Sequence, residues 1–303
     1  MSRLDFTIDT LGPAEYDSPL KLSLNKNDMI SDFVSDSDKI YYHNAVSADR
    51  STPESDGFAA MEMAGPREKI FFKPQEVKAA IVTCGGLCPG LNNVIRAVFM
   101  GLWHNYGVRD IIGFRFGYRG LLKEYGLDPM RLTPEVVKDI HHAGGTILGS
   151  SRGHGGRTVE MADTLEALGV NMLFTIGGDG TQKGSLAIYE EMERRGSKCT
   201  VVGIPKTIDN DLSYVERSFG FATAVSRAVD AVSGAHTEAE DSPNGIGLVK
   251  LMGRESGFIA AATALAMADV NFVLIPEMPF KLEGGSGFLA ALKRRLISRG
   301  HAV

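Results

Sequence analysis

The chain has 303 residues, an apolar content of 44% and a formal net charge of −5, which allows one large or two ordinary domains with a full core. This mild charge and a pI of about 5.8 argue against a general binder of nucleic acid or of membranes. Three cysteines provide no disulfide framework, no run is apolar enough to span a bilayer, and no signal-peptide pattern is present. These observations predict a cytoplasmic protein.

Residues 1–76 differ from the rest of the chain because they are polar, rich in Asp and Ser, and weak in apolar periodicity. They predict an irregular, extended N-terminal arm that serves self-association or regulation, with a poorly ordered tail as the alternative. The apolar positions Phe71-Phe72 and Met61 to Met63 are expected to dock this arm onto the body.

From Val77 onward, apolar runs alternate with helical patterns, which predicts an α/β fold with a mostly parallel sheet. Strands are expected at 78–83, 108–114, 170–176, 200–204, 246–251 and 272–275, with a further strand beginning at 300–303. Helices are expected at 92–104, 134–145, 158–168 with Thr158 as its cap, 183–195, 222–240, 257–268 and 287–298. Ligands of such folds bind beyond the carboxyl ends of the strands, where the glycine-rich loops of this chain also fall.

The run Gly177-Gly178-Asp179-Gly180-Thr181 joins an apolar strand to a helical pattern. Gly178 and Gly180 lack a Cβ, so bare backbone can approach a phosphate at the helix N-terminus. The Asp179 carboxylate would repel bound phosphates unless a cation stood between them, which indicates a magnesium site. The alternative is a tight turn with a solvated aspartate.

Two further glycine loops are candidate anion sites. Residues 83–92 include Gly85 and Gly86 and offer backbone amides before a helix; a turn made for packing is the alternative. Residues 144–153 include Arg152, whose paired donors suit a nucleotide phosphate, although a surface arginine explains it equally well.

The segment 203–211 carries the candidate acid–base chemistry. Asp209 and Asp211 are two residues apart, so an extended segment would point both to the same side. One carboxylate can accept a proton from an attacking hydroxyl, and Lys206 can neutralise developing phosphate charge. The alternative is an Asp-rich turn in which Asp209 caps a helix. A fourth loop, 250–257, offers Arg254 to the phosphate of a substrate.

These motifs in this order resemble the 6-phosphofructokinase family, and specifically its plant and trypanosome-type ATP-dependent subgroup. The resemblance runs from about Val77 to the end and rests on Gly177 to Thr181, Pro205 to Asp211 and Met252 to Arg254. It implies two Rossmann-like three-layer domains with mostly parallel sheets. The implied parts are an N-terminal extension (1–76), a large ATP-binding domain (77–221) and a partial small fructose 6-phosphate domain (222–303).

The resemblance also implies a role for each matching residue in the phosphorylation of fructose 6-phosphate at its 1-hydroxyl. Asp209 is the base, Asp179 holds Mg²⁺, Lys206 steadies the transferring group, and Asp211 supports the metal or the charge balance. Donor-binding positions are Gly85, Gly86, Arg152, Gly153, Gly178, Asp179, Gly180 and Thr181; sugar-phosphate positions are Thr207, Ile208, Asp209, Met252, Gly253 and Arg254.

Gly180 leaves room for the α-phosphate of ATP, whereas pyrophosphate-using relatives carry Asp there; Lys206 is the residue that pyrophosphate users carry. We therefore expect ATP as donor, with a pyrophosphate-dependent enzyme, a non-catalytic fragment or regulatory subunit, or a lipid or NAD kinase as alternatives. The run 205–211 argues against the last of these.

Two departures from the family pattern bear on these expectations. Gly245 stands where many bacterial members have an arginine, and the chain ends before the family's remaining sugar-phosphate residues, which predicts a truncated product. The resemblance further implies a glycolytic homo-oligomer, a tetramer or a dimer, and Glu277 resembles an allosteric position, although a structural role fits it as well.

Overall fold

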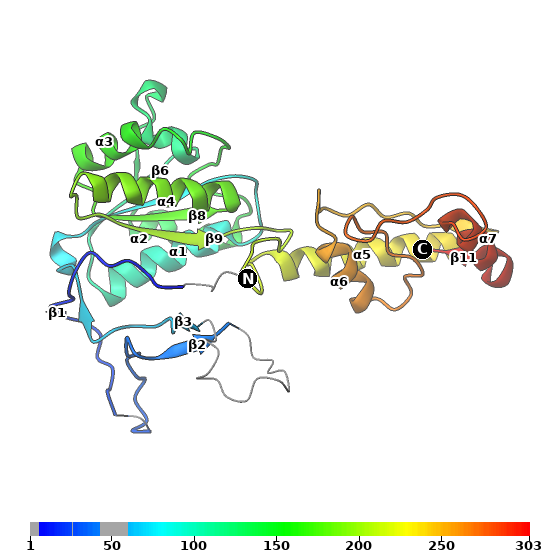
Figure 1. Ribbon diagram of the computed structural model, residues 1–303, viewed down its shortest axis with the longest axis horizontal. Coiled ribbons are helices and arrows are strands. Elements are labelled where there is room, and N and C mark those ends of the chain that lie inside the picture. Colours follow the sequence, from blue (N-terminus) through cyan, green and yellow to red (C-terminus); the bar gives the residue numbers. More distant parts are fainter. Residues whose placement is uncertain (1–5, 26, 43–59) are drawn as a thin grey trace.

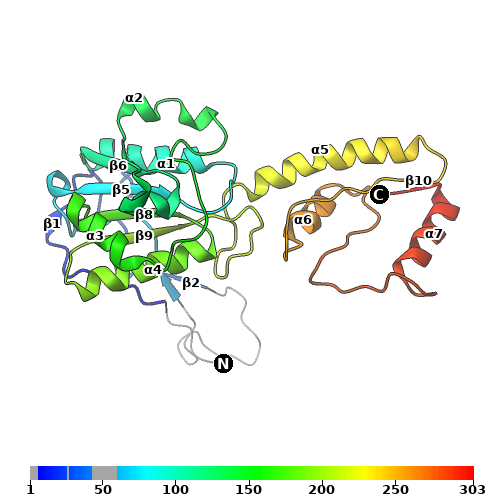
Figure 2. The same ribbon diagram turned by 90° about the horizontal axis from the view of Figure 1, so that it is seen from above.

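The computed structural model describes residues 6–25, 27–42 and 60–303 (Figure 1). A large α/β body is followed by a C-terminal lobe, and the long helix α5 (Phe221–Glu240) leads from one to the other (Figures 1 and 2). Among the described residues, no helix has both the length and the apolar character needed to cross a membrane.

The main sheet of the body has five strands in the order β7-β6-β5-β8-β9. Four of them are parallel, and the edge strand β7 runs antiparallel to β6. The four parallel strands confirm the predicted runs, with shifts of two residues or fewer. The bounds are β5 (Lys78–Thr83), β6 (Asp110–Phe114), β7 (Met130–Arg131), β8 (Met172–Gly177) and β9 (Thr200–Pro205).

The central strand β5 separates two apolar cores because side chains alternate between the faces of a strand. Ala79 and Ile81 lie in the core that α1 covers, whereas Ala80 and Val82 lie in the core that α3 and α4 cover. The sheet is therefore doubly wound, in agreement with the Rossmann-like three-layer domain that the resemblance implies. The helices of the body are α1 (Leu91–Met100), the π-helix η2 (Gly101–Asn105), the 3₁₀ turns η3 (Gly117–Leu121) and η4 (Lys123–Tyr125), α2 (Pro134–Val137), the 3₁₀ turn η5 (Ile140–His142), α3 (Thr158–Leu168) and α4 (Asp179–Arg194).

Two helix predictions need correction. The helix expected at 134–145 is broken into α2 and η5, although Val137 and Ile140 are both buried in the same core. Pro134 thus marks the start of a helix as predicted, but this helix ends at Val137 and not at Gly144-Gly145. Thr158 is the first residue of α3 rather than its cap; the cap position is Arg157, which makes no side-chain capping bond.

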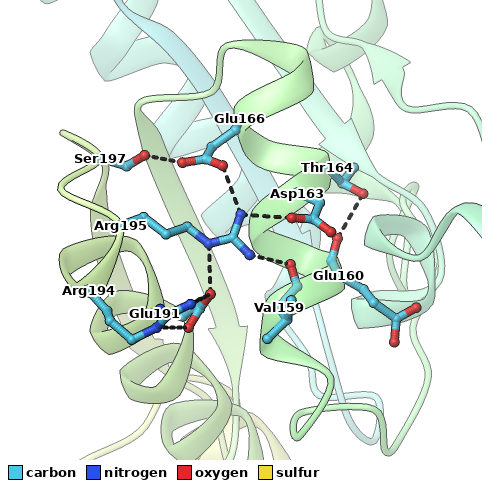
Figure 3. A network of polar contacts seen from close by, with 9 residues as sticks. All are labelled: Val159, Glu160, Asp163, Thr164, Glu166, Glu191, Arg194, Arg195 and Ser197. Atoms are coloured by element: carbon cyan, nitrogen blue, oxygen red, sulfur yellow. Dashed lines mark hydrogen bonds and ion pairs between the residues drawn. The ribbon is translucent and has the colours of Figure 1, made fainter.

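A network of ion pairs joins α3 to the end of α4 (Figure 3). Arg195 donates from Nη1 to Asp163 and to Glu166, in both cases at 2.8 Å, and from Nε to Glu191 at 2.7 Å. Its remaining nitrogen, Nη2, donates to the carbonyl of Val159 at 3.0 Å. One guanidinium thus links three carboxylates and a backbone group on two helices, which holds these helices to each other.

The C-terminal lobe contains a two-stranded parallel sheet, in which Gly245 pairs with His301 and Ile246 with Ala302. The strand expected at 246–251 is reduced to two residues, and the one expected at 272–275 is irregular. The strand expected at 300–303 is present. The elements are α5, β10 (Gly245–Ile246), α6 (Phe258–Ala266), α7 (Phe288–Arg299) and β11 (His301–Ala302).

The described part of the N-terminal arm is irregular, as predicted, and contains two short antiparallel pairs. Phe72 packs against the core on the α1 side, whereas Met61 pairs with Ile40 inside the arm and is not among the side chains packed against either core. Residues 1–5, 26 and 43–59 of the predicted arm lie outside the described residues. The elements are β1 (Tyr16–Asp17), β2 (Lys39–Tyr41), β3 (Ala60–Glu62), β4 (Lys69–Ile70) and the 3₁₀ turn η1 (Pro74–Glu76).

Candidate active site

The glycine loops meet at the carboxyl edge of the sheet, where the strand order reverses between β5 and β8. The amide of Cys84 donates to Ile176 O at 2.8 Å, and the amide of Lys206 donates to Gly177 O at 2.9 Å. The loop that carries Arg152 joins them, because the amide of Gly85 donates to Ser151 O at 2.9 Å. The structure therefore brings together three loops that are far apart in the sequence.

Lys206 follows the outer strand β9, and the residue is only 6% exposed. Its Nζ donates to Gly86 O at 2.6 Å, and a Cβ on Gly85 would lie 3.3 Å from the same nitrogen. Burial lowers the pKa of Lys206, and the nearby positive charge of Arg152 lowers it further. A Cβ on Gly86 would lie 3.4 Å from Nη2 of Arg152. Two cations thus converge on one stretch of bare backbone, which makes this edge suited to an anion.

Helix α4 contributes its N-terminus to the same edge. It begins at Asp179 with Gly178 as its cap, four residues before the predicted start at 183, so Gly180 and Thr181 belong to its first turn. The free amides of a helix N-terminus favour negative ligands. A Cβ on Gly180 would meet no atom within 4 Å. The backbone beside Gly180 therefore faces open space, which a nucleotide can fill.

Asp179 is the predicted magnesium ligand, and its side chain is 68% exposed. Its carboxylate pairs with Lys183 Nζ at 2.8 Å. Within residues 6–25, 27–42 and 60–303, no group of three or more His, Cys, Asp or Glu side chains could hold a metal ion. One accessible carboxylate fits Mg²⁺, because this ion keeps several waters and takes its other ligands from substrate phosphates.

Asp209 has an unusual environment for a carboxylate, since its Oδ1 is buried and finds no hydrogen-bond partner among the described residues. Burial raises the pKa of the Asp209 carboxyl, Asp211 raises it further, and Arg254 and Lys206 oppose this shift. A carboxylate with a buried, free oxygen and a raised pKa suits a proton acceptor.

The backbone around Asp209 differs from the extended segment that the sequence predicts. Asn210 has a positive φ of 56°, and Asp211 is exposed, where it accepts a hydrogen bond from Thr207 Oγ1. The turn therefore leaves Asp209 half-buried and Asp211 exposed, so the two carboxylates have different surroundings. No helix begins at Asp209, so the alternative of a capping aspartate is wrong. Ile208 lies between Thr207 and Asp209 in the same partly buried turn.

The loop before α6 reaches the segment 203–211 from the C-terminal lobe. Ser256 Oγ donates to Asp209 O at 3.2 Å, and the charge of Arg254 acts on the Asp209 carboxyl. Gly253 has a φ of 122°, and a Cβ there would lie 2.1 Å from Ser256 O, so only glycine fits. Met252 and Arg254 are exposed. This arrangement leaves a cationic side chain near the Asp209 carboxylate and open to solvent.

Glu277, which resembles an allosteric position, and Gly245, which replaces the arginine of many bacterial members, both have structural contacts in the C-terminal lobe. Glu277 Oε1 accepts from the amide of Gly257 at 2.7 Å, at the start of α6. A Cβ on Gly245 would lie 2.1 Å from the carbonyl oxygen of Ala239, so an arginine there would require a backbone shift.

Sequence reasoning missed Ser218 and Ser256, the serines that bond to the backbone of the segment 203–211. Neither was singled out by a glycine spacing or by a pair of charged residues. Their only sequence signal is a small polar residue near an apolar run, which is too common to identify them.

A doubly wound sheet with glycine loops, a helix N-terminus and two converging cations at its switch point is the arrangement typical of α/β proteins that bind phosphorylated ligands. A sequence profile described as phosphofructokinase matches residues 78–302. The chain belongs to the phosphofructokinase family.

Individual relatives agree with this assignment. The chain is 56% identical over 296 residues to ATP-dependent 6-phosphofructokinase of Borreliella burgdorferi. The aligned residues cover 98% of this chain and 65% of that protein. The chain is 53% identical over 240 residues to the chloroplastic ATP-dependent 6-phosphofructokinase 4 of Arabidopsis thaliana, covering 79% of this chain and 44% of that protein. The chain thus spans 65% or less of the length of these relatives.

Solved structures share the fold. A pyrophosphate-dependent phosphofructokinase from Marinobacter aquaeolei aligns with a TM-score of 0.65 at 24% identity, covering 75% of this chain and 59% of that one. Phosphofructokinase from Pichia pastoris in the T-state aligns with a TM-score of 0.63 at 25% identity, covering 82% of this chain and 26% of that one.

Proposed function

We propose that the protein transfers the γ-phosphoryl group of ATP to the 1-hydroxyl of D-fructose 6-phosphate, a step of glycolysis, in the cytoplasm and as a homo-oligomer. The observation that carries this proposal is the buried Oδ1 of Asp209, which no described residue bonds and on whose carboxyl the charges of Lys206 and Arg254 act. Membership of the phosphofructokinase family and the ATP-dependent names of its relatives support it.

Phosphoryl transfer requires positioning and charge stabilisation more than covalent chemistry. In the proposed reaction, Asp209 accepts the proton of the sugar hydroxyl, and Lys206 stabilises the charge on the transferring group. The amides of Gly85 and Gly86 and the N-terminus of α4 bind the donor phosphates. Mg²⁺, held by Asp179, neutralises phosphate charge when it is bound.

The sugar-phosphate side of the proposed site comes from two segments. Thr207 and Ile208 border the sugar, and Met252, Gly253 and Arg254 bind its phosphate through the exposed guanidinium. Asp211 keeps its supporting role through its bond with Thr207 Oγ1. Arg152 and Gly153 complete the donor side with Gly178, Gly180 and Thr181. We retain 77–221 and 222–303 as the proposed ATP and fructose 6-phosphate domains, after the extension 1–76.

The donor is proposed to be ATP because the space beside Gly180 is open. Pyrophosphate is the second candidate, and the buried Lys206 favours it as the residue that pyrophosphate users carry. The purified chain should convert fructose 6-phosphate with Mg-ATP and show at most slow turnover with Mg-pyrophosphate, measured as fructose 1,6-bisphosphate formed. Faster turnover with pyrophosphate would reverse the donor assignment, and no product with either donor would contradict the proposed function.

A further inference from the structure

Ser218 bonds to the segment 207–211, which contains the proposed base Asp209, and no sequence motif indicates this contact. Its side chain is buried, with 4% of the residue exposed. The hydroxyl accepts from the amide of Thr207 at 3.0 Å and donates to the carbonyl of the same residue. Both backbone groups of Thr207 are therefore satisfied by one side chain that lies eleven residues further along the chain. Because both backbone groups bond to the same hydroxyl, the backbone at Thr207 is held in one orientation.

Asn210 makes a second connection between the same two stretches. Its Oδ1 accepts from the amide of Ser218 at 2.7 Å, and its Nδ2 donates to Glu216 O at 3.0 Å. These bonds help to hold the positive φ of 56° at Asn210, a conformation that asparagine tolerates better than most residues. Asp209 lies between the two anchored residues, so its side chain direction is set from both sides.

The residue after Ser218 is joined to the first glycine loop. Cys88 Sγ contacts Phe219 O at 3.1 Å, and a Cβ on Gly220 would lie 2.3 Å from the same sulfur. Gly220, with a φ of 85°, is the cap of α5. Ser218 thus lies where the donor loop, the catalytic segment and the start of the C-terminal lobe come together.

We propose that Ser218 is a positioning residue for phosphoryl transfer: its hydroxyl holds the Thr207 peptide so that the Asp209 carboxylate faces the sugar hydroxyl. This inference rests on the proposed role of Asp209 as the base. The Ser218 hydroxyl bonds to Thr207 and to the carbonyl of Phe219, and it makes no bond to the amides of Gly85 and Gly86. The effect on turnover and that on donor binding are therefore separable.

The test compares Ser218→Ala with Ser218→Thr in the full chain. Ser218→Ala removes the hydroxyl with little change in volume and should lower kcat about ten- to a hundredfold, with the KM for Mg-ATP unchanged. Ser218→Thr keeps the hydroxyl and should restore most of the rate. Hydrogen–deuterium exchange should be faster across residues 207–211 in Ser218→Ala and should return toward wild type in Ser218→Thr.

Ser213→Ala is the matched control, because Ser213 is an exposed serine in the same loop, and it should behave as wild type in both measurements. A Ser218→Ala protein with wild-type kcat overturns the positioning role. Equal losses in turnover and in Mg-ATP binding would also overturn it, since they would show a general structural defect. If the wild-type chain transfers no phosphoryl group, the proposed function fails by itself, and unchanged exchange at 207–211 in Ser218→Ala then decides against the positioning role.

Discussion

The large body and the C-terminal lobe differ in how much apolar surface they bury. In the body, side chains such as Ile81, Phe99 and Leu165 have no exposed surface. In the lobe, no residue of α7 is buried, and Leu265 and Ile297 are 89% and 76% exposed. Because burial of apolar area is the main stabilising contribution, the body holds most of the folding free energy of the described chain.

This difference bears on the two sides of the candidate site. The loops of the proposed donor side, 83–92 and 177–181, follow strands β5 and β8 of the main sheet. The packing of this sheet holds these loops in place. The loop with Arg254 extends from the lobe and reaches Asp209 through the hydrogen bond that Ser256 makes to its backbone. Substitutions in the body should therefore reduce stability first, whereas substitutions near Asp209 and in the lobe should reduce turnover or sugar binding first.

The largest expected effect is a loss of turnover in a protein that still folds. Asp209→Asn keeps the shape of the side chain but cannot accept the proton, so kcat should fall by about 10²- to 10⁴-fold. Mg-ATP affinity, measured by calorimetry, should stay unchanged because the donor loops do not include this side chain. Retained turnover would show that another group is the base.

The stability comparison can be tested with one truncation in each region. Phe99→Ala removes a fully buried ring that stacks on Trp103 with 5.3 Å between centroids, and it should cost about 3–5 kcal/mol in urea unfolding. Leu265→Ala in the lobe should change the same free energy by less than about 0.5 kcal/mol. Similar costs at both sites would remove the contrast between the regions.

The open space beside Gly180 predicts a change in donor use. Gly180→Asp should fold normally, since its Cβ meets no atom within 4 Å, but its charge should crowd the α-phosphate. The KM for ATP should rise about tenfold, a free-energy change of about 1.4 kcal/mol. Gly180→Ala is the control for bulk without charge. An unchanged KM in Gly180→Asp would place the nucleotide elsewhere.

The raised pKa of Asp209 predicts a pH effect. Turnover should fall as the pH drops through this pKa, because the protonated carboxyl cannot act as a base. Burial raises the pKa and Asp211 contributes to the shift, so Asp211→Asn should move the acidic limb of the kcat profile to lower pH. The amide oxygen of this variant can still accept the hydrogen bond from Thr207 Oγ1. A limb that stays in place would show that Asp211 does not influence the base.

The smallest effect concerns the ion-pair network of the body. Hydrogen bonds from Arg194 and Arg195 lower the pKa of Glu191 to about 2. A lowered pKa contributes stability above the unfolded value, and this contribution is lost as the pH falls toward 2. Thermal melts of the wild type should therefore fall more steeply in this range than those of Arg195→Met. Parallel curves would show that the network contributes little to stability.

Sequence patterns predicted the parallel strands of the body well, because each is a short apolar run bounded by glycine or polar residues. They predicted the strands of the lobe poorly. The run 246–251 is apolar enough for a strand, yet its pairing with β11 ends at Gly247, whose amide donates to Ala302 O. A strand depends on its neighbour, and local composition does not indicate whether that neighbour is present.

Some features of the candidate site were likewise predictable from local sequence, and others were not. Glycine spacing after strands predicted the loops that the structure brings together at the carboxyl edge of the sheet, since the need for bare backbone is local. The direction of Asp209 is not local. It depends on Asn210 at positive φ and on Ser218, whose hydroxyl reaches back across the loop.

The amino-acid sequence by itself thus determined the α/β class, the succession of strands and helices in the body and the chemical types at the site, because these follow from periodicity and residue identity over short stretches. Only the tertiary structure decided that Lys206 is buried against Gly86, that Asp209 and Asp211 face different surroundings, and that Ser218 bonds Thr207. Those features depend on contacts between distant segments, which form only when the whole sheet and its loops have assembled.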